Sequence, residues 1–330
     1  MSCVLITGAA GFIGYSVTRA LLSDGGMRDK RRVVGVDNLN SYYPVKLKQD
    51  RLTELSRHSG FSFEMLDIAD DAALKSVFER YQPDSVLHLA AQAGVRHSIE
   101  NPFAYARSNL LGHLSVLEAC RRAEPRPRLV YASSSSVYGG NTKTPFSEDD
   151  PVDHPISLYA ATKRADELMS DCYAHLYGVE QIGLRFFTVY GPWGRPDMAY
   201  WTFTEKILAG EPIPVFNYGD QSRDFTYIDD IVQGVTRCLT RPPRFDGSTK
   251  HRVYNIGNNR PVPLMHFIDV LEAAIGKKAI RELMPSAPGD VQTTFADITM
   301  LSNDYGFAPT TTIEAGLPKF VDWYRRHFSR

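Results

Sequence analysis

The chain has 330 residues, and its 37 lysine and arginine side chains nearly balance 38 aspartate and glutamate side chains, for a formal net charge of −1. This balance excludes a general electrostatic attraction to nucleic acid or to a membrane surface. No apolar run approaches the ~20 residues of a membrane-spanning helix, and the N-terminus lacks the features of a signal peptide. We therefore expect a soluble, cytoplasmic protein.

Four widely scattered cysteines, of which no two form a C-x-x-C pair, argue against a metal ribbon or a disulfide framework. They are Cys3, Cys120, Cys172 and Cys238. A chain of this length buries roughly three quarters of its unfolded surface and needs no such support. We expect no metal site, and the length favours two domains.

Strand-like and helix-like segments alternate along the first half of the chain. Apolar runs that are joined by helical patterns are typical of a parallel, doubly wound (Rossmann-type) α/β sheet. The predicted strands are 3–7, 32–37, 61–66, 85–90, 128–133 and 179–187. The predicted helices are 12–23, 71–81, 103–122 and 158–177.

The pattern changes after about residue 191. Prolines interrupt the next segment, and irregular stretches separate the predicted helices 228–239, 264–275 and 313–327. We predict a NAD-binding Rossmann-type domain over residues 1–190. Residues 191–330 would form a smaller, loop-rich substrate region, partly interleaved with the first, that covers the ligand edge of the sheet.

A glycine-rich turn follows the first predicted strand directly. Gly8, Gly11 and Gly14 permit a tight turn and a close approach to a pyrophosphate, and the following helix offers free N–H groups and a positive dipole end. Asp37 ends the second predicted strand, where a carboxylate accepts the hydroxyls of the adenosine ribose and repels the 2′-phosphate of NADP. The sequence therefore predicts NAD as the cofactor.

Tyr159 and Lys163 lie four residues apart, so on a helix they share a face. Such a pair arises easily by chance, and Tyr42 and Lys46 form another, but Pro44 disfavours a helix there. The pair Tyr159 and Lys163 instead follows the serine-rich end of the fifth predicted strand, where a doubly wound sheet binds its ligand.

The chemistry of this pair is that of a base. A free phenol has a pKa near 10, but a lysine ammonium and an oxidised nicotinamide both favour the phenolate. Tyr159 could then take a proton from a sugar hydroxyl while hydride leaves the same carbon. The serine run 133–136 offers a hydroxyl that would orient the sugar oxygen.

Motifs along nearly the whole chain resemble the extended branch of the short-chain dehydrogenase/reductase superfamily, the NAD-dependent nucleotide-sugar epimerases and dehydratases. They are TGAAGFIG, Asp37, Asp67-Ile68, HLAAQAG, Asn109, SSSSVYG, YAATK and RDFTYIDD. Four segments resemble UDP-glucuronate 4-epimerases most closely: VDNLNSYYPVKLKQDRL, QAGVRHSIENP, RFFTVYGPWGRPDMA and PGDVQTTFAD.

The resemblance implies a path for the cofactor along the matching residues. These are Gly8, Gly11, Phe12, Ile13, Gly14, Asp37, Asn38, Asp67, Ile68, Leu89, Ala90, Ala91, Gln92, Asn109, Tyr159 and Lys163. It also implies that Tyr159 is the catalytic base, Lys163 the ribose anchor and Ser134 the orienting hydroxyl. Relatives form homodimers, which implies that helices 103–122 and 158–177 pair with those of a second copy.

Two serines argue against a dehydratase. The family's dehydratases commonly carry Asp-Glu where Ser135 and Ser136 stand, and its UDP-glucuronate decarboxylases usually carry the Glu. Without this acid, β-elimination of water lacks its proton carrier.

UDP-galactose 4-epimerases are also similar, but several carry Arg where Ala287 precedes Asp290.

A uronic-acid substrate would place a carboxylate beside the reacting carbon. The resemblance puts Thr188 and Arg195 there, and arginine binds a carboxylate through two parallel hydrogen bonds, which lysine cannot do. Arg223 would meet the diphosphate and Asp290 the uridine ribose. The complete set of predicted substrate residues is Ser134, Ser135, Ser136, Thr188, Arg195, Arg223, Asp290 and Arg96.

Three functions stay open at this point. The leading hypothesis is a 4-epimerase of a UDP-uronic acid, which oxidises C4 to a β-keto acid and must prevent its decarboxylation. A 4-epimerase of a neutral UDP-hexose is the second, although such a sugar has no use for Arg195. The third is an inactive NAD-bound regulator, against which the presence of Tyr159, Lys163 and Ser134 argues.

Overall fold

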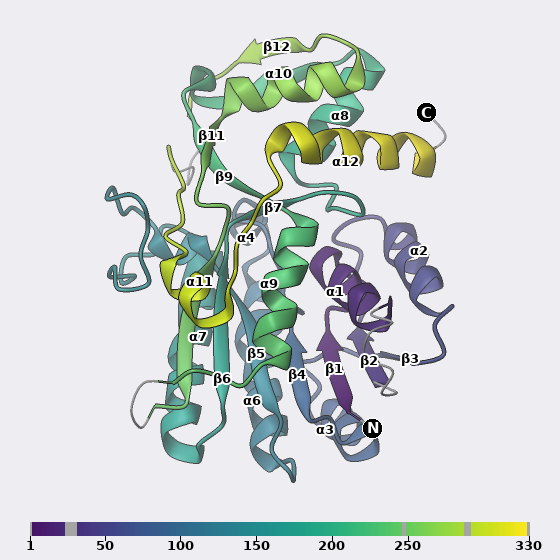
Figure 1. The fold of residues 1–330 in the computed structure, drawn as a ribbon, viewed down its shortest axis with the longest axis vertical. Coiled ribbons are helices and arrows are strands. Elements are labelled where there is room, and N and C mark those ends of the chain that lie inside the picture. Colours follow the sequence, from purple (N-terminus) through teal and green to yellow (C-terminus); the bar gives the residue numbers. More distant parts are fainter. Residues whose placement is uncertain (1, 24–31, 246–248, 287–291, 329–330) are drawn as a thin grey trace.

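The computed structural model describes residues 2–23, 32–245, 249–286 and 292–328. A parallel sheet of seven strands, in the order β10-β6-β5-β4-β1-β2-β3, forms its centre (Figure 1). The strands are β1 (Cys3–Thr7), β2 (Arg32–Asp37), β3 (Phe61–Met65), β4 (Ser85–His88), β5 (Arg128–Ser134), β6 (Gln181–Phe186) and β10 (His251–Ile256). This order confirms the doubly wound α/β fold, because the chain proceeds outward from β1 in both directions.

Alternate side chains of the strands pack into two hydrophobic layers, one on each face of the sheet. Cys3 and Leu5 of β1 pack with helices α3 (Asp71–Tyr81) and α6 (Gly112–Arg122), beside which lies α7 (Leu158–Tyr177). Val4 and Ile6 face the other way, toward α1 (Phe12–Ser23) and α9 (Ile228–Thr240). Burial on both faces explains why the central strands appear as continuous apolar runs in the sequence.

The seventh strand, β10, is the one strand of the sheet that the sequence analysis missed. It begins with the polar residues His251 and Arg252, which are only partly buried because the strand lies at the sheet edge. The apolar run that marks a central strand is therefore absent. Both β10 and α9 come from the second half of the chain, although they complete the layers built by the first half.

The predicted helix 103–122 contains an irregularity. Helix α5 (Pro102–Tyr105) follows α4 (His97–Glu100) and leads into a π-helical turn (Ala106–Leu111) before α6 begins. The turn carries Asn109, which is buried and bonded to neighbouring segments. Hydrophobic periodicity does not distinguish such a turn from an α-helix, because both keep the chain coiled in the same direction.

Several elements gather beyond the carboxyl ends of the strands, at the top of Figure 1. Helix α10 (Leu264–Ile275) packs on α8 (Ala199–Ala209) and α12 (Ile313–Phe328). A three-stranded sheet of β7 (Thr188–Tyr190), β9 (Ser222–Tyr227) and β11 (Pro261–Pro263) connects this group to the main sheet. The remaining elements are the pair β8 (Pro212–Val215) and β12 (Ile280–Leu283), α11 (Thr299–Tyr305), and 3₁₀ turns at Ser135–Tyr138 and Phe216–Gly219.

Two helices that the sequence analysis did not predict lie close to prolines. Helix α2 (Val45–Leu55) begins directly after Pro44, and α8 begins three residues after Pro196. Proline is compatible with a helix start, because the first turn leaves its N–H groups without intrahelical partners. The prolines therefore mark the beginnings of these helices, whereas the sequence analysis took them as signs of irregular structure.

The described part of the chain contains no helix with the combined length and apolar character needed to cross a bilayer. Within the same residues, no three His, Cys, Asp or Glu side chains come close enough together to hold a metal ion. All four cysteines are free, and Cys172 alone is exposed.

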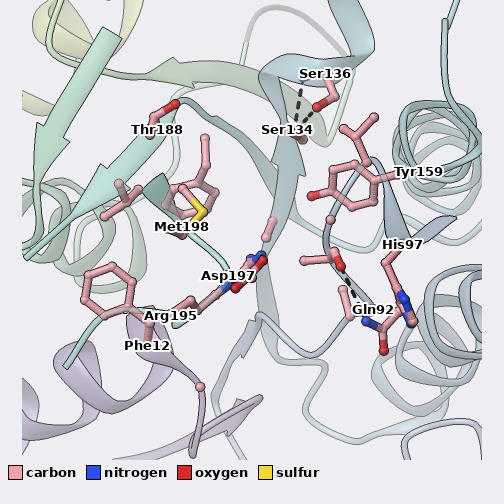
Figure 2. A pocket seen from close by; sticks show the side chains of 18 of the residues that line it. Phe12, Gln92, His97, Ser134, Ser136, Tyr159, Thr188, Arg195, Asp197 and Met198 are labelled. Atoms are coloured by element: carbon pink, nitrogen blue, oxygen red, sulfur yellow. Dashed lines mark hydrogen bonds and ion pairs between the residues drawn. The ribbon is translucent and has the colours of Figure 1, made fainter. Parts of the chain in front are cut away.

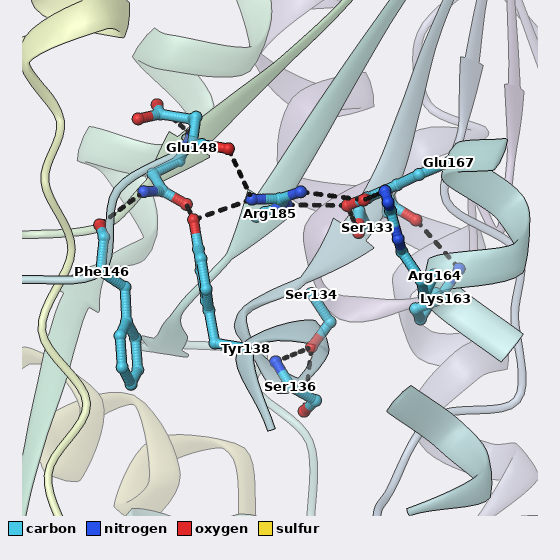
Figure 3. Close-up of polar contacts among 12 residues, drawn as sticks. Ser133, Ser134, Ser136, Tyr138, Phe146, Glu148, Lys163, Arg164, Glu167 and Arg185 are labelled. Carbon is cyan, nitrogen blue, oxygen red and sulfur yellow. Dashed lines mark hydrogen bonds and ion pairs between the residues drawn. The ribbon is translucent and has the colours of Figure 1, made fainter. Parts of the chain in front are cut away.

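A buried ion pair connects α7 to the sheet (Figure 3). Arg185 of β6 donates from Nε and Nη2 to the two carboxylate oxygens of Glu167 at 2.8 and 3.0 Å, and their side chains are 4% and 1% exposed. Ser133 donates to Glu167 at 2.6 Å, and Arg185 donates to the hydroxyl of Tyr138 at 3.0 Å. Tyr138 in turn donates to Asn255 at 2.7 Å, so the network reaches three strands.

We expect Glu167→Ala to lower the free energy of unfolding by about 3–5 kcal/mol, because it leaves the Arg185 guanidinium buried without its counter-charge. Urea denaturation of the purified protein measures this loss. The matched control is Glu79→Ala on α3, whose ion pair with Lys75 spans 3.7 Å between two exposed side chains and contributes about 0–1 kcal/mol. Equal losses in the two variants would contradict the prediction.

Candidate active site

One large cleft, of about 1040 Å³, lies at the carboxyl edge of the main sheet. It brings together side chains and backbone from segments that are far apart in the sequence. Figure 2 shows Ser134, Tyr159, Thr188 and Arg195 arranged around its open space. The predicted residues that line it are Gly8, Gly11, Phe12, Ile13, Gly14, Asp37, Asn38, Asp67, Ile68, Leu89, Ala90, Ala91, Gln92, Arg96, Ser134, Ser135, Ser136, Tyr159, Lys163, Thr188, Arg195 and Arg223.

Two predicted residues do not appear in this lining. Asn109 is buried behind the wall, where it accepts the N–H of Gln92 at 2.8 Å and donates to the Gln92 carbonyl at 3.1 Å and to Thr162 at 2.9 Å. It therefore holds the cleft wall in place, and its contact with a cofactor stays a prediction. Asp290 and its neighbour Ala287 lie outside the described residues.

The glycine loop has no room for side chains. Gly8 has a φ of +72°, and a Cβ there would lie 2.8 Å from the backbone nitrogen of Ala90. At Gly14 a Cβ would lie 2.1 Å from the Gly8 carbonyl oxygen. The resulting close packing places the start of α1 at the cleft, where its free N–H groups can bind a diphosphate, so the loop fits the cofactor predicted from the sequence.

Asp37 is nearly buried at the end of β2 and faces the cleft. Its two carboxylate oxygens accept the backbone N–H groups of Ala10 at 3.1 Å and Leu39 at 2.9 Å. A carboxylate can accept about four hydrogen bonds. Two are used to join the glycine loop to the loop after β2, which leaves acceptor capacity for two ribose hydroxyls.

Helix α7 presents Tyr159 and Lys163 to the cleft one turn apart. The Tyr159 ring contacts the Tyr105 ring edge-on, with 6.1 Å between ring centroids. Lys163 is almost completely buried, and its ammonium donates to the Ala132 carbonyl at 2.9 Å and to Asp166 at 3.0 Å. The sequence analysis did not anticipate Asp166, because an acidic residue on a helix usually faces solvent.

The alternation of strand β5 distinguishes the serines. Ser133 points into the core, where it donates to Glu167 at 2.6 Å. Ser134 points to the opposite face, into the cleft, and its hydroxyl donates to Ser136 at 3.2 Å and accepts the Ser136 N–H at 3.2 Å (Figures 2 and 3). Ser134 is therefore the strand serine available to a substrate in the cleft.

Arg195 is oriented by an acidic partner two residues away that the sequence analysis did not consider. Its Nε and Nη2 donate to the two oxygens of Asp197 at 3.0 and 2.5 Å, and Tyr42 donates to Asp197 at 3.2 Å. Burial, together with the nearby Asp197 charge, raises the pKa of Tyr42 to about 12. Tyr42 therefore keeps its proton at neutral pH and remains a donor to Asp197.

Tyr42 and Lys46 do not share a helix face, because α2 begins only at Val45. Lys46 points to solvent from α2 and forms an ion pair with Asp50. Tyr42 nevertheless lines the cleft through its contact with Asp197. Tyr42 is therefore a residue of the site, although it forms no helical pair with Lys46.

Arg51 is a further residue that sequence reasoning missed. It is fully buried, and it donates to the carbonyls of Ala10 at 2.8 Å, Trp193 at 2.6 Å and Gly194 at 2.8 Å. These carbonyls belong to the glycine loop and to the loop that carries Arg195. Three long-range backbone contacts leave no local pattern, so no sequence signal could have identified this role.

The other two predicted arginines are also held in the cleft. The guanidinium of Arg96 lies 4.6 Å from the centre of the Phe216 ring. Arg223 donates to the carbonyls of Ser222 at 2.9 Å and Gln292 at 3.0 Å. Together with Arg195 and Lys163, they give the cleft a positive character that the net charge of the chain does not reveal.

Comparisons with known proteins agree with this geometry. The model of the NAD dependent epimerase/dehydratase family matches residues 4–257. UDP-glucuronate 4-epimerase 3 of Arabidopsis thaliana is 48% identical over 99% of this chain and 77% of its own length. A probable UDP-glucuronate 4-epimerase of Rhizobium meliloti is 44% identical over 99% and 98% of the two chains.

A solved structure is similar over almost the whole chain. It is the crystal structure of UDP-glucuronic acid 4-epimerase from Bacillus cereus in complex with UDP-glucuronic acid and NAD, with a TM-score of 0.90, 34% identity, and coverage of 98% of this chain and 99% of that one. The family match confirms NAD as the cofactor. Because the family model matches most of its length, including the glycine loop and the tyrosine–lysine pair, the chain belongs to the NAD-dependent epimerase/dehydratase family.

Proposed function

We propose that this protein interconverts UDP-glucuronate and UDP-galacturonate by NAD-dependent epimerisation at C4. The observation that carries the proposal is Arg195, a guanidinium fixed by Asp197 in the same cleft as Tyr159 and Ser134. A neutral hexose offers no group for this cation, whereas a uronate offers a carboxylate. Relatives named UDP-glucuronate 4-epimerases at 48% and 44% identity support the same substrate.

The reaction needs a base, an oriented hydroxyl and a hydride acceptor. Tyr159 takes the proton of the C4 hydroxyl and later returns it, and Ser134 holds the sugar oxygen in place by a hydrogen bond. Lys163 anchors the ribose and favours the phenolate of Tyr159 by its positive charge. When bound, NAD accepts hydride from C4 and gives it back to the opposite face of the 4-keto sugar, so that it is not consumed.

The carboxylate creates a second requirement. Oxidation of C4 turns the uronate into a β-keto acid, which loses carbon dioxide when the bond to the carboxylate stands perpendicular to the carbonyl plane. Thr188 and Arg195 hold the carboxylate away from this orientation. Asp197 keeps Arg195 in position, because it binds one edge of the guanidinium and leaves the rest for the substrate, and the Tyr42 hydroxyl donates to Asp197 in turn.

The serine pair in the cleft supports an epimerase over a dehydratase. Ser135 and Ser136 line the cleft next to Ser134, and neither hydroxyl can carry the proton that β-elimination of water requires at neutral pH. The 4-keto sugar is therefore reduced again and not dehydrated.

The remaining assignments are parts of the same proposal. Residues 1–190 hold NAD along the glycine loop, Asp37, Asn38, Asp67 and Ile68. Residues 191–330 hold the nucleotide sugar, with Arg223 at the diphosphate, Asp290 at the uridine ribose and Arg96 as a further cation. The two regions interleave through α9 and β10. The protein acts in the cytoplasm, where nucleotide sugars are made.

We expect purified protein, incubated with UDP-glucuronate and no added NAD, to yield a mixture of the two 4-epimers. Anion-exchange chromatography of the nucleotides measures the proportion of the two epimers. Tyr159→Phe, which removes the proton carrier, should be about 10²–10⁴-fold slower. Turnover of UDP-galactose but not of UDP-glucuronate would instead establish a neutral-hexose epimerase. Turnover of neither sugar by NAD-loaded protein would favour a regulator.

We expect Arg195→Ala to release a UDP-pentose together with the epimers, because the freed carboxylate can reach the orientation from which carbon dioxide leaves. The same chromatography detects the pentose nucleotide. Arg57→Ala is the matched control, since Arg57 is an exposed arginine paired with Glu54. Unchanged epimerisation with no pentose in the Arg195 variant would rule out the proposed role.

We also propose that the protein is a homodimer joined through α6 and α7. These neighbouring helices and the turn before them expose Leu111, Leu114, Leu168 and Leu176, which are between 36% and 59% exposed. Contiguous exposed apolar side chains are uncommon on monomers and mark interaction sites. A twofold axis would place the same two helices of a second copy on this face and form a four-helix contact.

The double substitution Leu168→Glu/Leu176→Glu should convert the dimer into a monomer, because each copy would bring its new charges into an apolar contact. Sedimentation velocity measures the mass. Met65→Glu, at an apolar position on β3 that is 70% exposed, serves as control and should leave the mass unchanged. A wild-type protein that sediments as one chain would overturn the dimer.

A further inference from the structure

Lys163 shares its burial with a carboxylate that the mechanism above does not use. The ammonium lies 3.0 Å from Oδ2 of Asp166, and the two side chains are 4% and 0% exposed. An ammonium has three donors. Asp166 and the Ala132 carbonyl bind two of them, which leaves the third for the cleft.

The neutral groups around this pair cannot balance the ammonium. The rings of His88 on β4 and His113 on α6 are tilted relative to each other, with 5.2 Å between their centroids. Burial, reinforced by Lys163, lowers the pKa of His88 to about 3. Burial likewise keeps the pKa of His113 well below its usual value and that of Tyr131, on β5, well above its own. On β10, burial also lowers the pKa of His251.

The neighbouring carboxylate on α7 is already paired. Both oxygens of Glu167 accept hydrogen bonds from Arg185, and Oε2 also accepts one from Arg164 at 3.1 Å. Among the described residues, Asp166 is thus the one carboxylate in an ion pair with Lys163. Its other oxygen, Oδ1, is buried without a hydrogen-bond partner among them, so Lys163 provides its main compensation.

Asp166 is charged under ordinary conditions. Burial raises the pKa of Asp166 to about 6, and the adjacent Lys163 limits the rise. At pH 7 and above the carboxylate is therefore ionised and faces the ammonium. Without it, desolvation would favour the neutral amine, because burial lowers the pKa of a lysine by up to several units when no opposite charge is near.

We propose that Asp166 is a positioning residue that keeps the Lys163 ammonium charged and directed toward the cofactor side of the cleft. This proposal rests on the NAD-binding part of the proposed function and not on the identity of the sugar. A neutral amine would be a weaker donor to the ribose of NAD. It would also withdraw the positive charge that favours the phenolate of Tyr159.

The test is the affinity for NAD as a function of pH, measured by calorimetry on protein freed of cofactor. Asp166→Asn keeps the shape and an acceptor oxygen but removes the charge. We expect the ratio of its Kd to that of the wild type to rise at least about tenfold between pH 6 and pH 9, because an amine that is buried without an opposite charge favours its neutral form as the pH rises. Asp166→Glu, which retains the charge, should keep this ratio nearly constant.

Two further variants separate this role from a loss of structure. Asp166→Ser, which also removes the charge, should show the same pH-dependent weakening, and thermal unfolding verifies that each variant is folded. In a Lys163→Met background, Asp166→Asn should have no pH-dependent effect, because the group through which it acts is gone. A pH-independent ratio in the Asn and Ser variants would overturn the proposal. Failure to turn over UDP-glucuronate would leave it intact.

Discussion

Beneath the edge of the sheet that carries the cleft, Arg185 and Glu167 meet through two nitrogen–oxygen contacts in a nearly dry environment. Burying two charges is costly, and the structure offsets the cost with hydrogen bonds from Ser133 and to Tyr138. Because Glu167 lies on α7 and Arg185 on β6 beside β5, this pair fixes the helix that carries Tyr159 and Lys163 against the strand that carries Ser134. Arg185 forms its ion pair with Glu167, and the adjacent carboxylate, Asp166, forms one with Lys163.

A second buried cation connects the two ends of the cleft. Arg51 binds carbonyl oxygens of the glycine loop and of the loop before Arg195, so these two loops share one anchor. The near-neutral chain therefore contains a locally basic cleft. Its balanced composition excludes a basic surface but allows a few cations to be concentrated in one cleft.

Much of the fold could be predicted because it depends on local patterns. Continuous apolar runs identified the central strands, and 3.6-residue periodicity identified α1, α3, α7, α9, α10 and α12. The edge strand β10 lacks such a run, and prolines at the start of α2 and near α8 concealed these helices. For the site, nearly every residue that the motifs predicted lies in the lining of the cleft. Asp197, Arg51 and Asp166 were missed, because their roles depend on partners rather than on residue type.

The sequence by itself determined the glycine loop at the end of β1, the acidic end of β2 and the tyrosine–lysine spacing on one helix face. Each depends only on backbone conformation within a few residues. Tertiary structure decided which serine of β5 is bonded to Glu167 and which to Ser136, which carboxylate meets Lys163 and which carboxylate orients Arg195. Hydrogen bonds and ion pairs act over a few ångströms. Only the folded chain brings Arg51 within reach of Trp193, or β5 beneath α7.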